Sequence, residues 1–266
     1  FVTGFRADPG NRSLVHHVIA FMADPDKKST FEAMDERDPD VGYTCFGGPG
    51  ELNRGVQWMG SWAPGGLGAD FPEGTGIAVA PGSKLILQVH YNTLEQAPAP
   101  DQTSVSFKID DTVAKRAMWM PWTSPLWVGG EGMEIPAGEA DVRHQWVLDP
   151  TAYGLPFDNG AFDVHLVALH LHLLGRSARL DVLRADADDT CLLHIPDWDF
   201  NWQSSSRLAE PVRFNPGDRL RLACQWDNSE ENQPIVNGQR PAPQDVAWGE
   251  GTRDEMCLGL AYVAQP

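Results

Sequence analysis

Turn-forming residues interrupt this chain so often that little room remains for long helices. It contains 26 glycines and 21 prolines in 266 residues, and few segments carry the 3.6-residue apolar period of an amphipathic helix. Short runs of alternating apolar and polar residues lie between the turns, as is typical of half-buried β-strands. Only residues 30–37 (TFEAMDER) have the pattern of a short helix. The sequence therefore predicts an all-β, sandwich-like fold.

The length allows one large domain or two of ordinary size. Residues 121–130 (PWTSPLWVGG) are the best candidate for a linker. A repeat supports a division there, because residues 81–92 (PGSKLILQVHYN) match residues 216–227 (PGDRLRLACQWD) at an offset of 135 positions. A generic turn followed by a strand would also produce one short match of this kind. We predict two tandem β-sandwich domains, over residues 1–124 and 125–266.

The charge balance excludes some classes of partner. There are 37 acidic against 20 basic side chains, a formal net charge of −17, which argues against binding to nucleic acids and to anionic membrane surfaces. No apolar run reaches the roughly 18 residues needed to span a bilayer. Phe1 opens directly onto a strand-like segment without a signal peptide, so we expect the sequence to be that of a processed or trimmed chain.

The four cysteines indicate an oxidising compartment. They are Cys45, Cys191, Cys224 and Cys257, and no two form a C-x-x-C motif, which argues against a zinc ribbon or a thioredoxin-like site. An even number in a β-rich chain suggests one or two disulfides and a secreted or periplasmic protein. Cys257 could pair with Cys224. The other two could pair together or remain free.

Histidines supply the candidate metal ligands. Residues 164–175 (VHLVALHLHLLG) read as a buried strand on which His170 and His172, two positions apart, face the same side and could share one ion. Two buried, hydrogen-bonded histidines are the alternative. His16 and His17 are adjacent, so they could share an ion only at a bulge or at a strand end. His90 lies in line with Gln88 on a buried strand, where polar groups require partners.

Met256 opens the last predicted strand, directly after two acidic residues. A methionine in this position is ordinarily a core residue. A disulfide between its neighbour Cys257 and Cys224 would hold it rigidly, as a weak thioether ligand requires.

Four motifs in this order resemble those of the copper type II, ascorbate-dependent monooxygenases. They are the histidine pair at 16–17, LQVHY at 87–91, HLHLLG at 170–175 and DEMC at 254–257. The resemblance extends over nearly the whole chain, including IPAGE at 135–139. It implies two jelly-roll-like, antiparallel β-sandwiches, each with a copper site, that face each other across a solvent-filled cleft.

The resemblance also implies a role for each ligand. The ligands of an electron-storing copper correspond to His16, His17 and His90. The catalytic ligands of the copper at which O₂ is activated correspond to His170, His172 and Met256. Gln88 and Tyr262 are expected to line the substrate cleft. Independently of any family, imidazole and thioether together favour Cu(I) over zinc, which prefers cysteine, histidine and carboxylate.

The expected function is therefore that of a dicopper monooxygenase, which hydroxylates a C–H bond of an organic substrate with O₂ and a one-electron donor such as ascorbate. Peptide-hydroxylating members carry an arginine where this chain has Ala168, and Leu258 and Leu260 replace polar and aromatic residues, which favours a less charged substrate. His144, His165 and His194 match no motif. The alternatives are a non-catalytic copper-binding or copper-delivery protein that retains the ligands, and a zinc hydrolase that would leave Met256 unexplained.

Overall fold

The structure is a computed structural model that describes residues 1–45, 48–50, 55–66, 68–93, 97–157, 160–235, 238–251 and 253–266. Within these residues it consists mainly of β-strands, with two α-helices, Lys28–Arg37 (α1) and Pro125–Val128 (α2), and a 3-10 helix, Pro150–Tyr153. The all-β prediction is confirmed, and the short helix expected at 30–37 is the greater part of α1. No helix among the described residues is both long and apolar enough to cross a membrane.

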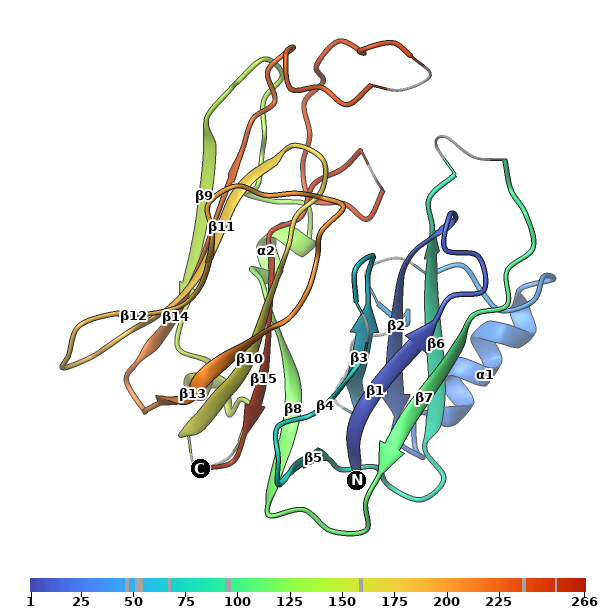
Figure 1. The fold of residues 1–266 in the computed structure, drawn as a ribbon, viewed down its shortest axis with the longest axis vertical. Coiled ribbons are helices and arrows are strands. Elements are labelled where there is room, and N and C mark those ends of the chain that lie inside the picture. Colours follow the sequence, from blue (N-terminus) through green and yellow to red (C-terminus); the bar gives the residue numbers. More distant parts are fainter. Residues whose placement is uncertain are drawn as a thin grey trace. The chain divides into compact units, whose positions relative to one another are not determined.

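The chain separates into two compact units, Phe1–Trp119 (unit 1) and Met120–Pro266 (unit 2). The boundary expected from the sequence lies between residues 124 and 125. Figure 1 labels the strands of each unit. Those that begin in unit 1 are β1 (Val2–Asp8), β2 (Val15–Ala23), β3 (Val56–Trp62), β4 (Ala69–Asp70), β5 (Thr75–Ile77), β6 (Lys84–Tyr91), β7 (Ser104–Ile109) and β8 (Lys115–Trp122). Those of unit 2 are β9 (Val142–Leu148), β10 (Phe162–His170), β11 (Gly175–Leu183), β12 (Thr190–Ile195), β13 (Ser206–Phe214), β14 (Arg219–Trp226) and β15 (Leu258–Ala264).

Two sheets pack together in unit 1. One has the strand order β3-β2-β6, and in the other β1 pairs with β4, β5 and β7. Phe5 of β1 lies against Gly60 of β3 so closely that a Cβ at Gly60 would be 2.4 Å from the Phe5 ring. On the β2–β6 sheet, Phe31 of α1 packs with Phe21 and Ile86 in a buried apolar cluster. Thus α1 packs against β2 and β6, and β1 packs against β3 of the same sheet.

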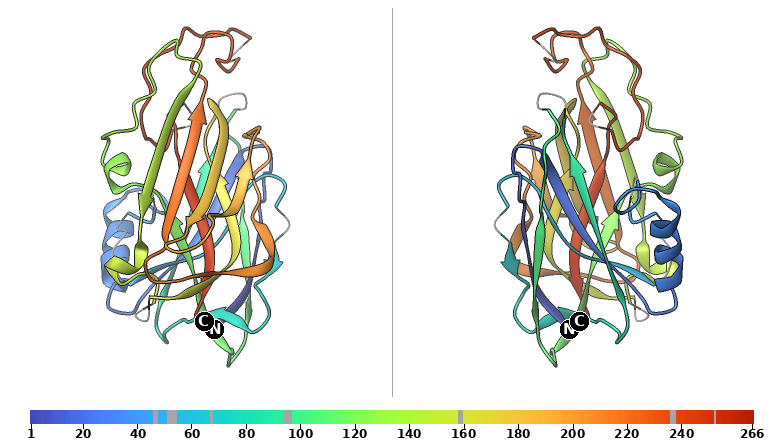
Figure 2. Two further views of the ribbon diagram at one scale, coloured as in Figure 1. Left: turned by 90° about the vertical axis from the view of Figure 1, so that its left-hand side faces the viewer. Right: turned by 90° about the vertical axis from the view of Figure 1, so that its right-hand side faces the viewer.

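Unit 2 also contains two packed sheets. One has the order β12-β11-β14-β9, and in the other β10 lies between β13 and β15. In the left view of Figure 2, strands β9, β14 and β11 run side by side. A Cβ at Gly259 of β15 would be 3.5 Å from Leu222 and 3.6 Å from Leu180, both of which are fully buried. The two sheets therefore share an apolar core.

The sequence repeat corresponds to a shared turn and strand. β6 and β14 have bounds at the same offset of 135 residues, and Gly82 and Gly217 take the same left-handed conformation in the preceding turns, with φ of 86° and 92°. The two strands differ in their neighbours. In the sheet orders given above, β6 is the last strand and pairs with β2, whereas β14 lies between β11 and β9.

A disulfide joins Cys224 of β14 to Cys257, just before β15. This is the pairing considered from the sequence. Cys191 is an exposed free thiol on β12, so the alternative in which it pairs with Cys45 is not found.

Candidate metal sites

Three histidines converge where β2 and β6 pair. His17 is directly opposite His90, and the register shifts between Val15 and His17, so the irregularity that adjacent histidines require is present at His16. One ring nitrogen from each of the three residues lies within 4.8 Å of those of the other two, and the ring centroids of His17 and His90 are 4.5 Å apart. Nitrogens bound to one ion would be separated by roughly 3–4 Å, so small side-chain movements would suffice.

The surroundings of His90 favour neutral imidazole. His16 is buried, and His17 and His90 are half-buried. Burial lowers the pKa of His90 below its ordinary value, because transfer out of water penalises the charged ring. Neutral imidazole is the form that binds a metal, so burial favours the metal-binding form of His90.

Gln88 lies on the same strand as His90, two residues earlier, but its amide is occupied. Its Nε2 donates to Gly48 O at 3.3 Å and contacts Cys45 Sγ at 3.7 Å. In the structure Gln88 thus links β6 to Cys45 and Gly48. A role in contacting substrate stays a prediction.

His170 and His172 lie together at the end of β10, with ring centroids 5.0 Å apart. His170 Nδ1 is 2.6 Å from Gln203 Oε1, and His172 Nδ1 is 2.9 Å from the backbone oxygen of Asp254. The Gln203 amide is fixed in this orientation because its Nε2 donates to Phe200 O at 2.7 Å. Both neighbours of the rings are acceptors, so each Nδ1 carries the proton and each Nε2 has its lone pair available for a metal.

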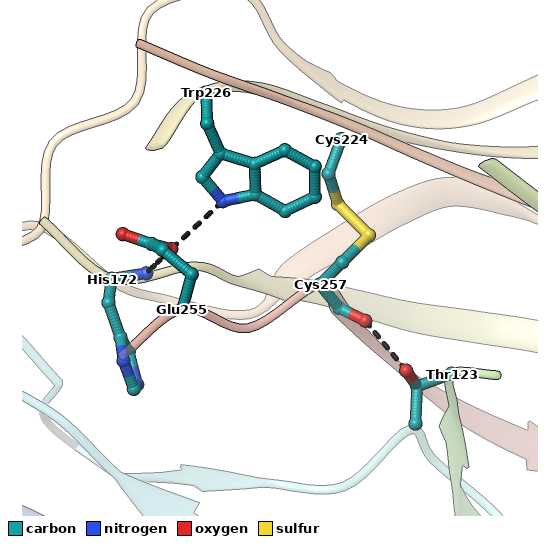
Figure 3. Close-up of a disulfide and its surroundings, with 6 residues drawn as sticks. All are labelled: Thr123, His172, Cys224, Trp226, Glu255 and Cys257. Carbon is teal, nitrogen blue, oxygen red and sulfur yellow. Dashed lines mark hydrogen bonds between the residues drawn. A yellow bond between two sulfur atoms is a disulfide. The ribbon is translucent and has the colours of Figure 1, made fainter. Parts of the chain in front are cut away.

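Met256 is buried between two anchored residues. On one side, Cys257 is bonded to Cys224, and its backbone oxygen accepts a hydrogen bond from Thr123. On the other side, the fully buried Glu255 accepts hydrogen bonds from the backbone N–H of His172 and from the indole of Trp226, both at 2.9 Å. Figure 3 shows these anchors together. The backbone at Met256 is therefore held near that of His172.

The Glu255 carboxylate also accepts a hydrogen bond from Leu174 N at 2.6 Å. Burial raises the pKa of Glu255 to about 7, and the N–H donors around the carboxylate oppose this rise.

The three residues at which the sequence is expected to differ from the peptide-hydroxylating proteins that it resembles share a face with His170. The β10–β15 register pairs His170 with Leu258 and Ala168 with Leu260, and directly paired residues project to the same side. Small and aliphatic side chains thus occupy the positions beside His170. Tyr262, two positions further along, is fully buried. Its expected place at the substrate cleft stays a prediction.

Gln203 and Glu255 were not predicted from the sequence as residues that support the histidines. Gln203 belongs to an aromatic segment, residues 196–203 (PDWDFNWQ), and is 33 positions away from His170, so no local spacing connects the two. Glu255 lies inside the DEMC motif. Glu255 could have been found from its position, because a carboxylate at the start of an otherwise apolar strand needs several hydrogen-bond partners.

Comparisons with known proteins agree on one family. Residues 126–264 match the model of the copper type II ascorbate-dependent monooxygenase C-terminal domain. DBH-like monooxygenase protein 2 of Mus musculus is 26% identical over 261 residues, which is 93% of this chain and 38% of that protein. Dopamine beta-hydroxylase of Homo sapiens is 26% identical over 263 residues, 95% of this chain and 39% of that protein.

Tyramine beta-hydroxylase of Caenorhabditis briggsae is 21% identical over 259 residues, 96% of this chain and 40% of that protein. The chain thus spans about two fifths of the length of these relatives.

Proposed function

Because the chain belongs to the copper type II ascorbate-dependent monooxygenase family, we propose that it is a dicopper enzyme that hydroxylates a C–H bond of a small organic substrate. The reaction inserts one oxygen atom of O₂ into the bond and reduces the other to water. It takes two electrons from two one-electron donors such as ascorbate. Each unit would form a jelly-roll-like sandwich with one copper, and the two sites would face a common cleft.

The observation that carries this proposal is the convergence of His16, His17 and His90. These residues lie outside the segment 126–264 that the family model matches, and yet each places one ring nitrogen within 4.8 Å of those of the other two. The fold of unit 2 does not require this second group of imidazoles in unit 1. The cluster therefore supports a separate site for electron storage.

The donor atoms at the second site suit copper. His170 and His172 offer Nε2 atoms whose orientation is fixed, and Met256 would supply a soft thioether, which favours Cu(I) over zinc. Copper held by these residues would supply the one-electron chemistry that O₂ reduction needs. The protein contributes oriented ligands, and three ligands at each site would leave a position open.

The neighbourhood of His170 supports an uncharged contact region on the substrate. Ala168, Leu258 and Leu260 offer no hydrogen-bond donors or charges beyond their backbone, so a substrate carboxylate would lose its hydration there without compensation. The net charge of −17 supports a partner other than nucleic acid. The disulfide supports a secreted or periplasmic location.

The first test is to measure copper content and ascorbate-dependent O₂ uptake while small organic substrates are screened. We expect about two coppers per chain, one bound at each group of ligands, together with uptake that a substrate stimulates. His90→Ala should lose one copper and the uptake, whereas His194→Ala, a change to an exposed histidine on β12, should lose neither. Zinc in place of copper would contradict the proposal. Two coppers without uptake would favour the copper-delivery alternative.

Gln203→Leu is expected to weaken copper binding at the second site by about 10–100-fold, the usual effect of removing the group that orients a ligating histidine. The leucine leaves the Nδ1–H of His170 without the acceptor at 2.6 Å. Gln203→Glu keeps an acceptor and should bind copper more tightly than the leucine variant. Competition with a Cu(I) chelator measures the affinities, and Gln145→Leu, at an exposed position of β9, is the control. Equal affinities in all variants would exclude this role.

A further inference from the structure

Glu255 connects three segments of unit 2 through its side chain and its backbone. Its carboxylate accepts from His172 N and Leu174 N, directly beyond the end of β10, and from the indole of Trp226 on β14. Its backbone connects to a third segment, because Glu255 N donates to Ala247 O at 3.2 Å and Gly249 N donates to Glu255 O at 3.1 Å. The residue is fully buried.

Stability alone does not account for a carboxylate in this position. Burying a charge is costly, and well-packed apolar side chains often give equal or greater stability than buried charged groups. A carboxylate can, however, accept several N–H donors at once. His172 and Leu174 lie beyond the end of β10, so their N–H groups need other acceptors. Glu255 therefore takes the place of a missing strand partner for the segment that carries His172.

We propose that Glu255 is a positioning residue that fixes the backbone of His172 relative to that of Met256, so that imidazole and thioether reach the same ion. Methionine is flexible and its sulfur is a weak ligand, so its contribution depends on how firmly its backbone is held. The Cys224–Cys257 disulfide anchors the other side of Met256. The inference rests on the proposed function only for the identity of the ion, copper.

The test compares Glu255→Gln with Asp181→Asn in the Cu(I)-loaded protein. Asp181 is the matched control, because it is equally buried and pairs with Arg179 and Arg221 on β11 and β14, about 20 Å along β11 from Gly175. X-ray absorption reports the sulfur ligand directly, chelator competition reports affinity, and thermal unfolding reports stability. None of these measurements requires turnover.

We expect Glu255→Gln to lose the sulfur signal and at least tenfold in affinity at the second site, while the three-histidine site stays loaded. The amide can accept from one of its two ends only, so the donors of His172 and Leu174 cannot both be satisfied. Asp181→Asn should lose stability but keep the sulfur signal. Glu255→Asp, which keeps the charge on a shorter side chain, should recover part of the sulfur signal. If Glu255→Gln does not fold, Glu255→Asp is the variant that is compared with Asp181→Asn.

Three outcomes decide the question. A normal sulfur signal and normal affinity in Glu255→Gln would overturn the inference. An equal loss of sulfur in Glu255→Gln and Asp181→Asn would also overturn it, because the effect would then be one of general stability. Absence of sulfur in the unmodified Cu(I) protein would instead contradict Met256 as a ligand, and with it the proposed function.

Discussion

Met256→Ala is expected to abolish ascorbate-dependent hydroxylation and to lower the copper content from about two to about one per chain. The thioether is the ligand that makes the second site selective for Cu(I). Without it, His170 and His172 would form a two-coordinate site with no soft donor. The cluster in unit 1 is formed by three imidazoles, so its copper should remain. Metal analysis, O₂ uptake and X-ray absorption on the same sample measure each effect.

The matched control is Met133→Ala. Met133 and Met256 are both buried in unit 2, at 2% and 6% exposure. Each truncation removes the same atoms from an apolar environment and should cost roughly 2–5 kcal/mol of stability. Only the change at Met256 should alter copper content. If both variants lost copper equally, Met256 would be a packing residue, the role that most methionines have.

The sequence predicted what depends on local pattern. Strand parity predicted that His170 and His172 face the same side, and their rings do lie together, although β10 ends at His170. The adjacent pair His16 and His17 required a break in strand regularity, and the register of β2 shifts at that point. In each case the prediction needed only the two-residue repeat of side-chain direction along a strand and the fact that a bulge interrupts this repeat.

What the sequence could not predict depends on contacts between distant segments. Gln203 reaches His170 from a loop beyond β12, and Glu255 reaches Leu174 across 81 positions, so neither follows from spacing. The burial of a strand residue likewise depends on what packs over it. Tyr262 is fully buried, and its expected place at the cleft stays a prediction.

Removing the disulfide with Cys224→Ala and Cys257→Ala together is expected to lower the free energy of unfolding of unit 2 by roughly 3–4 kcal/mol. The bond joins residues separated by 33 positions, and closing a loop of this size restricts the unfolded chain by about that amount. Urea denaturation measures the effect. Because the chain has two compact units, two transitions can occur, and only the one that includes unit 2 should move.

Cys191→Ala is the control for this experiment, because Cys191 is an exposed free thiol in the same unit and its loss should leave the urea midpoint unchanged. Both sulfur-bearing residues of the disulfide are buried, at 3% and 0% exposure, so a thiol reductant should act on the unmodified protein only as it unfolds. The double variant should then match the reduced wild type. An unchanged unfolding free energy in the double variant would contradict the prediction. If the double variant lost stability but kept its Cu(I)–sulfur signal, Glu255 alone would hold the backbone of Met256 in place.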